Sequence, residues 1–467
     1  MSDTELPEPL TDRTGDQLDR DDHLRPAFVD AVLGAVRDGD PERARALVAP
    51  LHPADIADLF ELTPGDERDD LARALADLVD ADVFAEMNDY VREDLIDELS
   101  PTQVADIASE LDTDDAVAII EDMEPADQRE VLRAMEPDDR AAIEEALRYP
   151  EESAGRLMQR ELIAVPLHWT VGDTIDYLRS HDDLTTDFWE IFVVDGRHHP
   201  VGTCALSWIL RTPRSVAMAD VMKREQTLIQ VDMDQEEVAL RFQKYALISA
   251  AVVDGSGRLV GMITVDDIVH IIQQEAGEDV LRLSGAGEGD INEPILFTVR
   301  TRLTWLVVNL ATAMLASWVV NLFQGEIAKF AVLAVLMPIV SGMGGNAGTQ
   351  TLAVAVRAIA TNQLTDSNTI RTIVRELRIA AANGVALGVI VALGSYLIFH
   401  NRDLSIVMGA AMVINNLVAG MSGVIVPVTL DKFRVDPAVS SAVFVTMMTD
   451  TMGFLSFLGL ATWWGLG

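Results

Sequence analysis

The chain has 467 residues, a formal net charge of −40 and one cysteine, Cys204. A single cysteine excludes an intrachain disulfide, and so acidic a surface repels nucleic acid and anionic lipid while it attracts cations. The length predicts about three domains.

The charge is divided unevenly along the chain. Residues 1–290 carry 25 Lys and Arg against 67 Asp and Glu, whereas residues 291–467 carry 10 against 8 and are rich in apolar residues. The sequence therefore predicts an acidic soluble part followed by a membrane part. Lysine is scarce, as in proteins of salt-loving organisms, where salt screens self-repulsion. On that interpretation most of the carboxylates are simply solvated surface.

Residues 1–25 are acidic and lack an apolar core, so we expect a disordered tail and not a signal peptide. Residues 26–150 have a helical pattern that repeats beyond Asp80. Helices this short cannot stand alone, so we expect them to stack into a superhelix, as solenoid repeats do. The repeat is marked by apolar residues twelve positions apart, each before a short polar break: Met87, Leu99, Leu111, Met123 and Met135.

Two α/β units follow, at residues 151–215 and 216–272, each with a short strand, a helix and two further strands. This duplication resembles a pair of CBS modules, which commonly bind adenosine compounds. In the second copy Thr264 and Asp267 match the family's strand-end signature and would meet the ribose and phosphate of a nucleotide such as ATP. The first copy has Ala205 and Trp208 at these positions. We expect at most one nucleotide site; two modules that only dock are the alternative.

Residues 273–297 predict a connecting helix with an acidic cluster at Glu275, Glu278 and Asp279, followed by a break at Gly285–Gly289. A charged helix between a sensor and a membrane part is well placed to transmit motion. A plain linker is the alternative.

Residues 298–467 form the predicted membrane part, an all-α domain with five spans of about 20 residues or more. Eight basic residues then lie on the side of the acidic part and two on the other side, which satisfies the positive-inside rule. The N-terminal domains are thus expected in the cytoplasm and the C-terminus outside the cell. The spans are placed at about 303–323, 328–360, 372–399, 404–430 and 438–466.

A glycine-rich stretch, Pro338–Gln350, interrupts the second apolar run. Broken backbone at membrane depth is tolerated where it is buried in protein or lines a watery cavity. We therefore expect the helix to break here and to bring Gly345 and Asn346 to an ion pathway. Close helix packing through small residues is the alternative.

Asp450 lies near the middle of the last span, where a carboxylate costs about 2.5–3.5 kcal/mol on insertion scales. No Lys or Arg shares its depth, so a cation is the simplest partner; a protonated carboxyl in a helix contact is the alternative. Asn346, Asn415 and Asn416 offer further oxygen ligands, or else interhelical hydrogen bonds. Such hard ligands suit Mg²⁺, Ca²⁺ or Mn²⁺.

The order of parts resembles the MgtE family of magnesium transporters, and the motifs at Tyr149–Met158, Gly344–Gln350 and Val435–Ala438 carry the resemblance. It implies a homodimer with the pore between the two membrane parts, where Asp450 of both chains holds a hydrated Mg²⁺. It also implies that cytoplasmic Mg²⁺ closes the pore by bridging acidic residues of the helical repeat, the CBS pair and the connecting "plug" helix. The matching residues are Asp114, Asp234, Glu236, Asp267, Glu275, Glu278 and Asp279, whereas Ala118, Ala246 and His270 stand where acidic residues are usual.

We therefore expect a gated, Mg²⁺-selective channel or transporter whose partners are the lipid bilayer, Mg²⁺ and a second copy of the chain. Two alternatives stay open: a less selective carrier of Co²⁺ or Mn²⁺, and a membrane-bound, nucleotide-responsive regulator. The sequence has no P-loop and no nucleophile–base set, so we do not expect an enzyme.

Overall fold

The computed structural model describes residues 17–19, 23–97, 99–121, 123–181, 184–185, 188–284, 295–365, 367–438 and 441–466, without the side chains of Asp279 and Ser284. Most of the expected acidic tail and all of the expected break at Gly285–Gly289 lie outside these residues. The chain forms two compact units, Met1–Ile272 and Gln273–Gly467.

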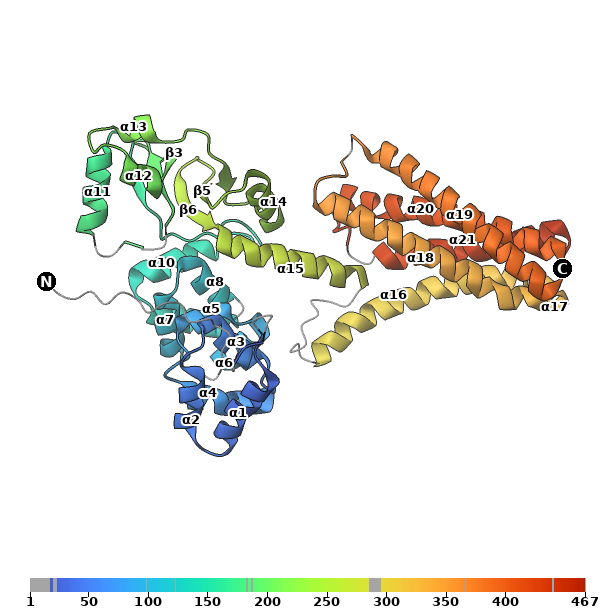
Figure 1. The fold of residues 1–467 in the computed structure, drawn as a ribbon, viewed down its shortest axis with the longest axis horizontal. Coiled ribbons are helices and arrows are strands. Elements are labelled where there is room, and N and C mark those ends of the chain that lie inside the picture. The colour runs from blue at the N-terminus through green and yellow to red at the C-terminus, as the bar shows by residue number, and fades with distance from the viewer. Residues whose placement is uncertain are drawn as a thin grey trace. The chain divides into compact units, whose positions relative to one another are not determined.

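Short helices make up the described part of the N-terminal region (Figure 1). Successive helices from α6 to α10 begin twelve residues apart, which confirms the predicted repeat. The helices are α1 (Pro26–Arg37), α2 (Pro41–Val48), α3 (Pro53–Glu61), α4 (Gly65–Leu75), α5 (Ala81–Glu86), α6 (Asp89–Ile96), α7 (Pro101–Glu110), α8 (Thr113–Glu121), α9 (Pro125–Ala134) and α10 (Pro137–Ala146).

Local capping and a shared core explain why such short helices form. Ser100 caps α7, since its hydroxyl accepts a hydrogen bond from the backbone N–H of Gln103. In return, the side-chain oxygen of Gln103 accepts a hydrogen bond from the backbone N–H of Ser100. Val91, Ile120 and Val131, on α6, α8 and α9, are fully buried in one continuous core. Helices of two or three turns gain their stability from such packing rather than from their own propensity.

Two three-stranded sheets follow and confirm the duplication. In each, the first strand pairs parallel to the second and the second antiparallel to the third. The register shifts at the same place in both copies, between Val193 and Val194 and between Val252 and Val253. The elements are β1 (Ala164–Pro166), α11 (Val171–Ser180), β2 (Glu190–Val194), β3 (Pro200–Ala205), α12 (Leu206–Arg211), α13 (Met218–Val221), β4 (Leu228–Gln230), α14 (Gln235–Tyr245), β5 (Ser249–Val253) and β6 (Leu259–Thr264).

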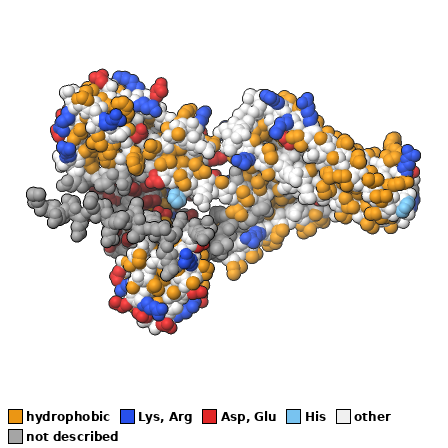
Figure 2. Space-filling model, viewed as in Figure 1, with side chains coloured by type: hydrophobic (Ala, Val, Ile, Leu, Met, Phe, Trp, Pro, Cys, Tyr) orange, Lys and Arg blue, Asp and Glu red, His pale blue; other side chains and the backbone are white. Residues whose placement is uncertain are grey.

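Five long apolar helices of the second unit are able to span a membrane, among the described residues, which confirms the predicted number. α20 packs against α18, α19 and α21, and α16 packs against α21. Hydrophobic side chains are spread over the visible face of this bundle (Figure 2). The helices are α16 (Ile295–Leu322), α18 (Val332–Ala360), α19 (Thr369–Phe399), α20 (Arg402–Lys432) and α21 (Ser441–Trp464), with a short α17 (Gln324–Lys329) between the first two.

The glycine-rich stretch does not break the second span. α18 runs as one helix from Val332 to Ala360, so the predicted break is wrong, and glycines of this stretch pack closely against other helices. A Cβ on Gly348 would lie 2.5 Å from Cγ1 of Val445 on α21. The missing side chain allows this approach, and a continuous helix keeps the backbone groups satisfied, as a bilayer requires.

Candidate cation sites

Asp450 lies on α21 and meets α18 through Ser341. The Ser341 hydroxyl donates a hydrogen bond to Oδ1 of Asp450, and the carboxylate is only partly buried within a single chain. No Lys or Arg of the described residues pairs with it. Asp450 thus lies near the middle of a candidate membrane span, where the sequence placed it, and accepts a hydrogen bond from a neutral hydroxyl that the sequence did not predict.

Asn415, on α20, is fully buried beside the same two helices. Its Nδ2 donates to the carbonyl oxygen of Val340, the residue before Ser341, at 2.8 Å. A Cβ on Gly344 would lie 2.0 Å from Nδ2, and one on Gly453 would lie 2.8 Å from it. These two glycines therefore make the space that Asn415 occupies. Its Oδ1 is buried and has no hydrogen-bond partner among the described residues.

The other predicted pore residues lie apart from this group. Asn416 donates to the carbonyl of Met412 in its own helix at 2.9 Å, and its Cβ faces Gly384 of α19. Asn346 lies on an exposed face of α18. Gly345 is closer to the candidate site, since a Cβ there would lie 3.9 Å from Oγ1 of Thr449. The structure thus brings Asn415 and Gly345 near Asp450, but places Asn346 and Asn416 on other faces.

A second acidic group lies at the start of α8, within the first unit. The Thr113 hydroxyl donates to Oε1 of Glu161 at 2.8 Å, which ties α8 to the segment that precedes β1. Asp114 follows, with its Oδ1 buried and unpaired among the described residues. Burial, together with the negative charge of Asp267, raises the pKa of Asp114 well above its usual range.

Neighbouring carboxylates share this environment. Burial, reinforced by Asp267 and Asp112, raises the pKa of Asp115 to about 6. Burial also raises the pKa of Asp267, although a hydrogen bond from Thr264 and the neighbouring His270 oppose the rise. Carboxylates that are crowded and poorly neutralised favour a proton or a metal cation. Nevertheless, no three or more His, Cys, Asp or Glu side chains of the described residues converge closely enough to hold one ion together.

The remaining predicted sensing residues have other contacts in the structure. Asp234 caps α14 by accepting from the backbone N–H of Glu236 at 2.9 Å. On α15 (Val265–Ser284), Glu278 pairs with Arg282, and Glu275 lies one turn before it. Asp279 has no described side chain. The sequence alone could not show whether Asp234 caps a helix or binds a metal ion, because both roles use the same carboxylate.

The predicted nucleotide residues are adjacent in the structure. Thr264, at the end of β6, donates from its hydroxyl to Oδ2 of Asp267 at 2.7 Å. In the first copy, Ala205 ends β3 and the Trp208 side chain is 65% exposed, so these two positions form no equivalent polar pair. One carboxylate, Asp267, thus belongs both to the nucleotide pair and to the acidic group around Asp114.

Three family models match parts of this chain. Residues 337–460 match the MgtE model, described as a divalent cation transporter; residues 51–152 match the MgtE intracellular N domain, and residues 218–274 match the CBS domain. Two solved structures are similar to the soluble region. The soluble part of a magnesium transporter is 25% identical, with a TM-score of 0.46 over 54% of this chain and 98% of that chain. The cytosolic domain of the Mg²⁺ channel MgtE in complex with ATP is 28% identical, with a TM-score of 0.48 over 52% and 99%.

Full-length relatives are more informative. The magnesium transporter MgtE of Enterococcus faecalis is 31% identical over 319 residues, which are 68% of this chain and 70% of the relative. The magnesium transporter MgtE of Bacillus subtilis is 30% identical over 317 residues, again 68% and 70%. Similarity at this level extends across the soluble and membrane parts together. The chain therefore belongs to the MgtE family.

Proposed function

We propose that this protein carries Mg²⁺ across a membrane along a path that passes Asp450. The observation that carries the proposal is a carboxylate in the middle of a membrane helix with a hydroxyl donor, Ser341, and no basic partner among the described residues. An isolated charge at that depth is unfavourable, and a cation beside it reduces the cost. The names of the relatives support Mg²⁺ as the cargo.

The ligand chemistry supports a hydrated ion. Mg²⁺ loses water reluctantly and commonly binds one or two carboxylates while it keeps several waters. Asp450 supplies one carboxylate and is only partly buried, so water around an ion can reach it, whereas the amide oxygen of Asn415, unpaired among the described residues, is buried within the chain. Co²⁺ and Mn²⁺ accept the same oxygen ligands, so these ligands do not separate the three ions, and a flux measurement with competing ions is needed to determine the selectivity for Mg²⁺.

We further propose that the path lies between two copies of the chain. The exposed face of α18 carries Asn346, Thr349 and Gln350, with Gly342 one turn before them. Polar groups of this kind are poorly suited to lipid. A second copy with water between the two faces would cover them, and it would bring a second Asp450 to the path.

The charges at the helix ends support a cytoplasmic position for the soluble unit. Both ends of the α18–α19 connection are basic, with Arg357 before it and Arg371 after it, whereas Lys329 and Arg402 lie at the opposite ends of the spans. The positive-inside rule then places the start of α16 in the cytoplasm. The end of α21 would face the outside.

Regulation by cytoplasmic Mg²⁺ is proposed for the acidic group at Asp114, Asp115 and Asp267. Burial raises the pKa of all three carboxyl groups, and the negative charge of Asp267 adds to the rise at Asp114 and Asp115, so their ionised forms are unfavourable in the packed unit. A bound divalent cation would compensate these buried negative charges, and hence would stabilise the packed form over a loosened one. A ligand shifts such an equilibrium only through its different affinity for the two forms. Oxygen ligands of this kind fit Mg²⁺.

Nucleotide binding at Thr264 and Asp267 is a separate proposal for the second α/β copy. The hydroxyl and carboxylate are already aligned at 2.7 Å. Calorimetry with ATP on the full chain tests it, and Asp267→Ala should abolish the binding heat. Unchanged ATP binding by this variant would assign the nucleotide elsewhere.

The transport proposal is tested by flux into proteoliposomes. Purified protein is reconstituted in liposomes that contain a Mg²⁺-sensitive dye, and external Mg²⁺ is added with and without Co²⁺, Mn²⁺ or Ca²⁺. Mg²⁺ entry above that of protein-free liposomes supports the proposal. Equal entry of Co²⁺ and Mn²⁺ favours a less selective carrier, and no entry of any of these cations contradicts transport.

A further inference from the structure

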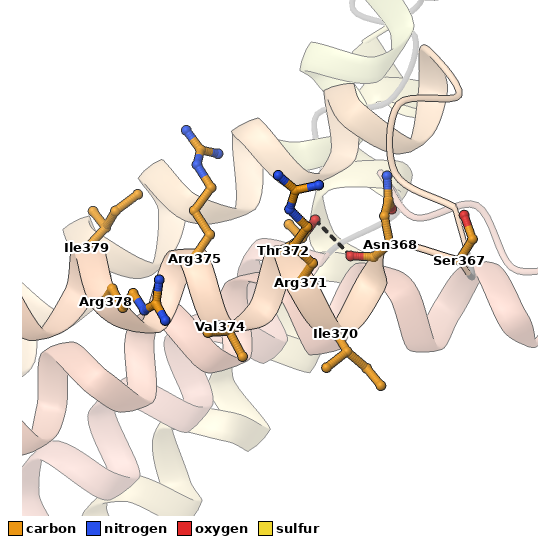
Figure 3. A pocket seen from close by; sticks show the side chains of 9 residues that line it. All are labelled: Ser367, Asn368, Ile370, Arg371, Thr372, Val374, Arg375, Arg378 and Ile379. Carbon is orange, nitrogen blue, oxygen red and sulfur yellow. Dashed lines mark hydrogen bonds between the residues drawn. The ribbon is translucent and has the colours of Figure 1, made fainter.

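A row of basic side chains follows one side of the first turns of α19. Arg371, Arg375 and Arg378 are separated by four and three residues, so they lie on neighbouring turns of one helix face. In Figure 3 the guanidinium groups of Arg371 and Arg375 extend to one side of the helix, while Ile370 and Val374 project to the other. Together these residues line an open hollow of about 1000 Å³.

The three arginines are poorly neutralised. Arg371 and Arg378 have no ion-pair partner among the described residues, and Arg375 contacts only the adjacent Glu376, at 3.3 Å. All three side chains are exposed, whereas Glu376 is buried against the bundle. Two full positive charges are therefore available to a ligand. This row differs from the acidic soluble part, because residues 291–467 are nearly neutral.

The helix length places the row at the edge of a bilayer. α19 has 31 residues, which corresponds to about 46 Å at 1.5 Å per residue, whereas a bilayer's hydrocarbon core is about 30 Å thick. Ile379 to Phe399 contains no Asp, Glu, Lys or Arg and can cross that core. The arginines precede it and lie at headgroup depth. Ile379, which directly follows Arg378 and is 41% exposed, offers an apolar surface where this apolar stretch begins.

We propose that Arg371, Arg375 and Arg378 bind the phosphate of an anionic phospholipid headgroup in the inner leaflet. Arginine forms bidentate, charge-assisted hydrogen bonds with phosphate, and basic pockets at membrane helices on the cytoplasmic side are suited to anionic headgroups. A free phosphate ion would use the same guanidinium groups but would gain nothing from Ile379 and the apolar stretch that follows it. The apolar surface beside the row therefore favours lipid. The choice of leaflet rests on the orientation proposed above.

The test uses the full chain in a neutral detergent, with phosphatidylglycerol, phosphatidylcholine and inorganic phosphate as probes and native mass spectrometry as the readout of bound lipid. The variant R371Q/R378Q removes the two arginines without partners and leaves Arg375 with Glu376. The matched control R300Q/R302Q removes two charges from α16 on the same proposed side, where spacing by two residues prevents a shared row. A thermal unfolding curve checks that each variant folds, and the single variant R371Q serves if the double variant does not.

We expect phosphatidylglycerol to bind more tightly than phosphatidylcholine, and its affinity to fall about fivefold for each arginine removed. The control variant should keep the native preference. Equal binding of the two lipids, native phosphatidylglycerol binding by R371Q/R378Q, or inorganic phosphate that binds as tightly as the lipid would each overturn the proposal. Mg²⁺ flux is measured on the same preparations. If the protein prefers phosphatidylglycerol to phosphatidylcholine but carries no Mg²⁺, only the transport proposal fails. If it carries Mg²⁺ but binds the two lipids equally, only the lipid-site proposal fails.

Discussion

The hydroxyl of Ser341 on α18 donates a hydrogen bond to the carboxylate of Asp450 on α21, across a sequence separation of 109 residues. This bond joins two candidate membrane helices near the middle of α21. Among the described residues of the bundle, Asp450 is the only Asp or Glu in the middle of a span. A hydroxyl donor orients the carboxylate without cancelling its charge. Asp450 thereby stays able to attract a cation.

Replacing Ser341 by Ala should weaken transport while the charge of Asp450 is retained. Loss of a group that orients a metal-binding carboxylate typically lowers metal affinity or activity about 10–100-fold. We expect the Mg²⁺ concentration for half-maximal flux to rise by about tenfold. Ser405→Ala is the control, since Ser405 is also buried but donates to the carbonyl of Asn401. Native flux in S341A would show that the hydroxyl has no part in orienting the acid.

Adding one methyl group at Gly344 should destabilise the bundle. A Cβ there would lie 2.0 Å from Nδ2 of Asn415, so Asn415 would have to leave its hydrogen bond to Val340. Overpacking of this kind costs about 1–3 kcal/mol. The control is Gly342→Ala, where a Cβ meets nothing within 4 Å. Thermal unfolding in detergent measures both, and equal stability of the two variants would contradict the packing role of Gly344.

The end of α15 is joined to the loop before α21 by an ion pair. Nη1 of Arg282 lies 2.6 Å from Oδ2 of Asp436. If α15 transmits the closing signal, Asp436→Asn should leave more residual flux at saturating cytoplasmic Mg²⁺. The pair is partly exposed and is worth about 0.2–1 kcal/mol, so a change of up to about fivefold is expected. The amide introduced by this substitution keeps an oxygen for the backbone N–H of Ala438, from which Asp436 accepts a hydrogen bond at 2.7 Å.

Asp431→Asn is the matched control for that measurement, because Asp431 is an exposed acid at the end of α20. At saturating cytoplasmic Mg²⁺, the D431N variant should show the same residual flux as the native protein. Identical residual flux in D436N, D431N and native protein would remove the Arg282–Asp436 pair from the gating proposal.

Acid should replace Mg²⁺ in stabilising the first unit. The pKa of Asp115 is raised to about 6 in the folded protein, so its protonated form favours folding. Such a contribution is complete at low pH and is lost as the pH rises through about 6. Without Mg²⁺, protease protection of residues 17–272 should therefore increase as the pH falls from about 7.5 to about 5.5.

The variant D115N should weaken this dependence, because Asp114 and Asp267 still titrate, whereas D138N, which removes an exposed acid of α10, should leave it unchanged. Mg²⁺ at the higher pH should also restore protection in the native chain. Protection that decreases on acidification would contradict the destabilising effect assigned to the buried, ionised carboxylates.

Much of the fold could be predicted from local patterns. The twelve-residue spacing from Met87 onward predicts one helix per repeat because each unit has its own apolar positions and its own break. The strands around Val193 and Val252 could be predicted because the same order of elements occurs in both copies, so each copy supports the assignment in the other. The five spans follow from length and hydropathy alone.

The interior of the membrane bundle could be predicted less well, because it depends on which helices are neighbours. Glycine favours a break when it stands alone, but Gly344 and Gly348 face Asn415 and Val445, and this packing keeps α18 intact. Asn415 and Asn416 are adjacent in sequence yet point about 100° apart around α20. Only the placement of α18 and α21 shows which of the two lies near Asp450.

Ser341 was missed for a related reason. A serine in an apolar helix usually donates to a carbonyl one turn earlier, and nothing in the local sequence indicates a partner on another helix. The only sequence feature that pointed to Ser341 was its position in the glycine-rich stretch Pro338–Gln350, which was expected to line the ion pathway.

The most direct test of the central claim is the rate of Mg²⁺ entry into proteoliposomes that contain Asp450→Ala, compared with Asp403→Ala at the exposed start of α20. The pathway proposed here predicts that D450A reduces Mg²⁺ entry to the level of protein-free liposomes while D403A stays close to native. Native, Mg²⁺-selective entry through well-folded D450A protein would contradict the account.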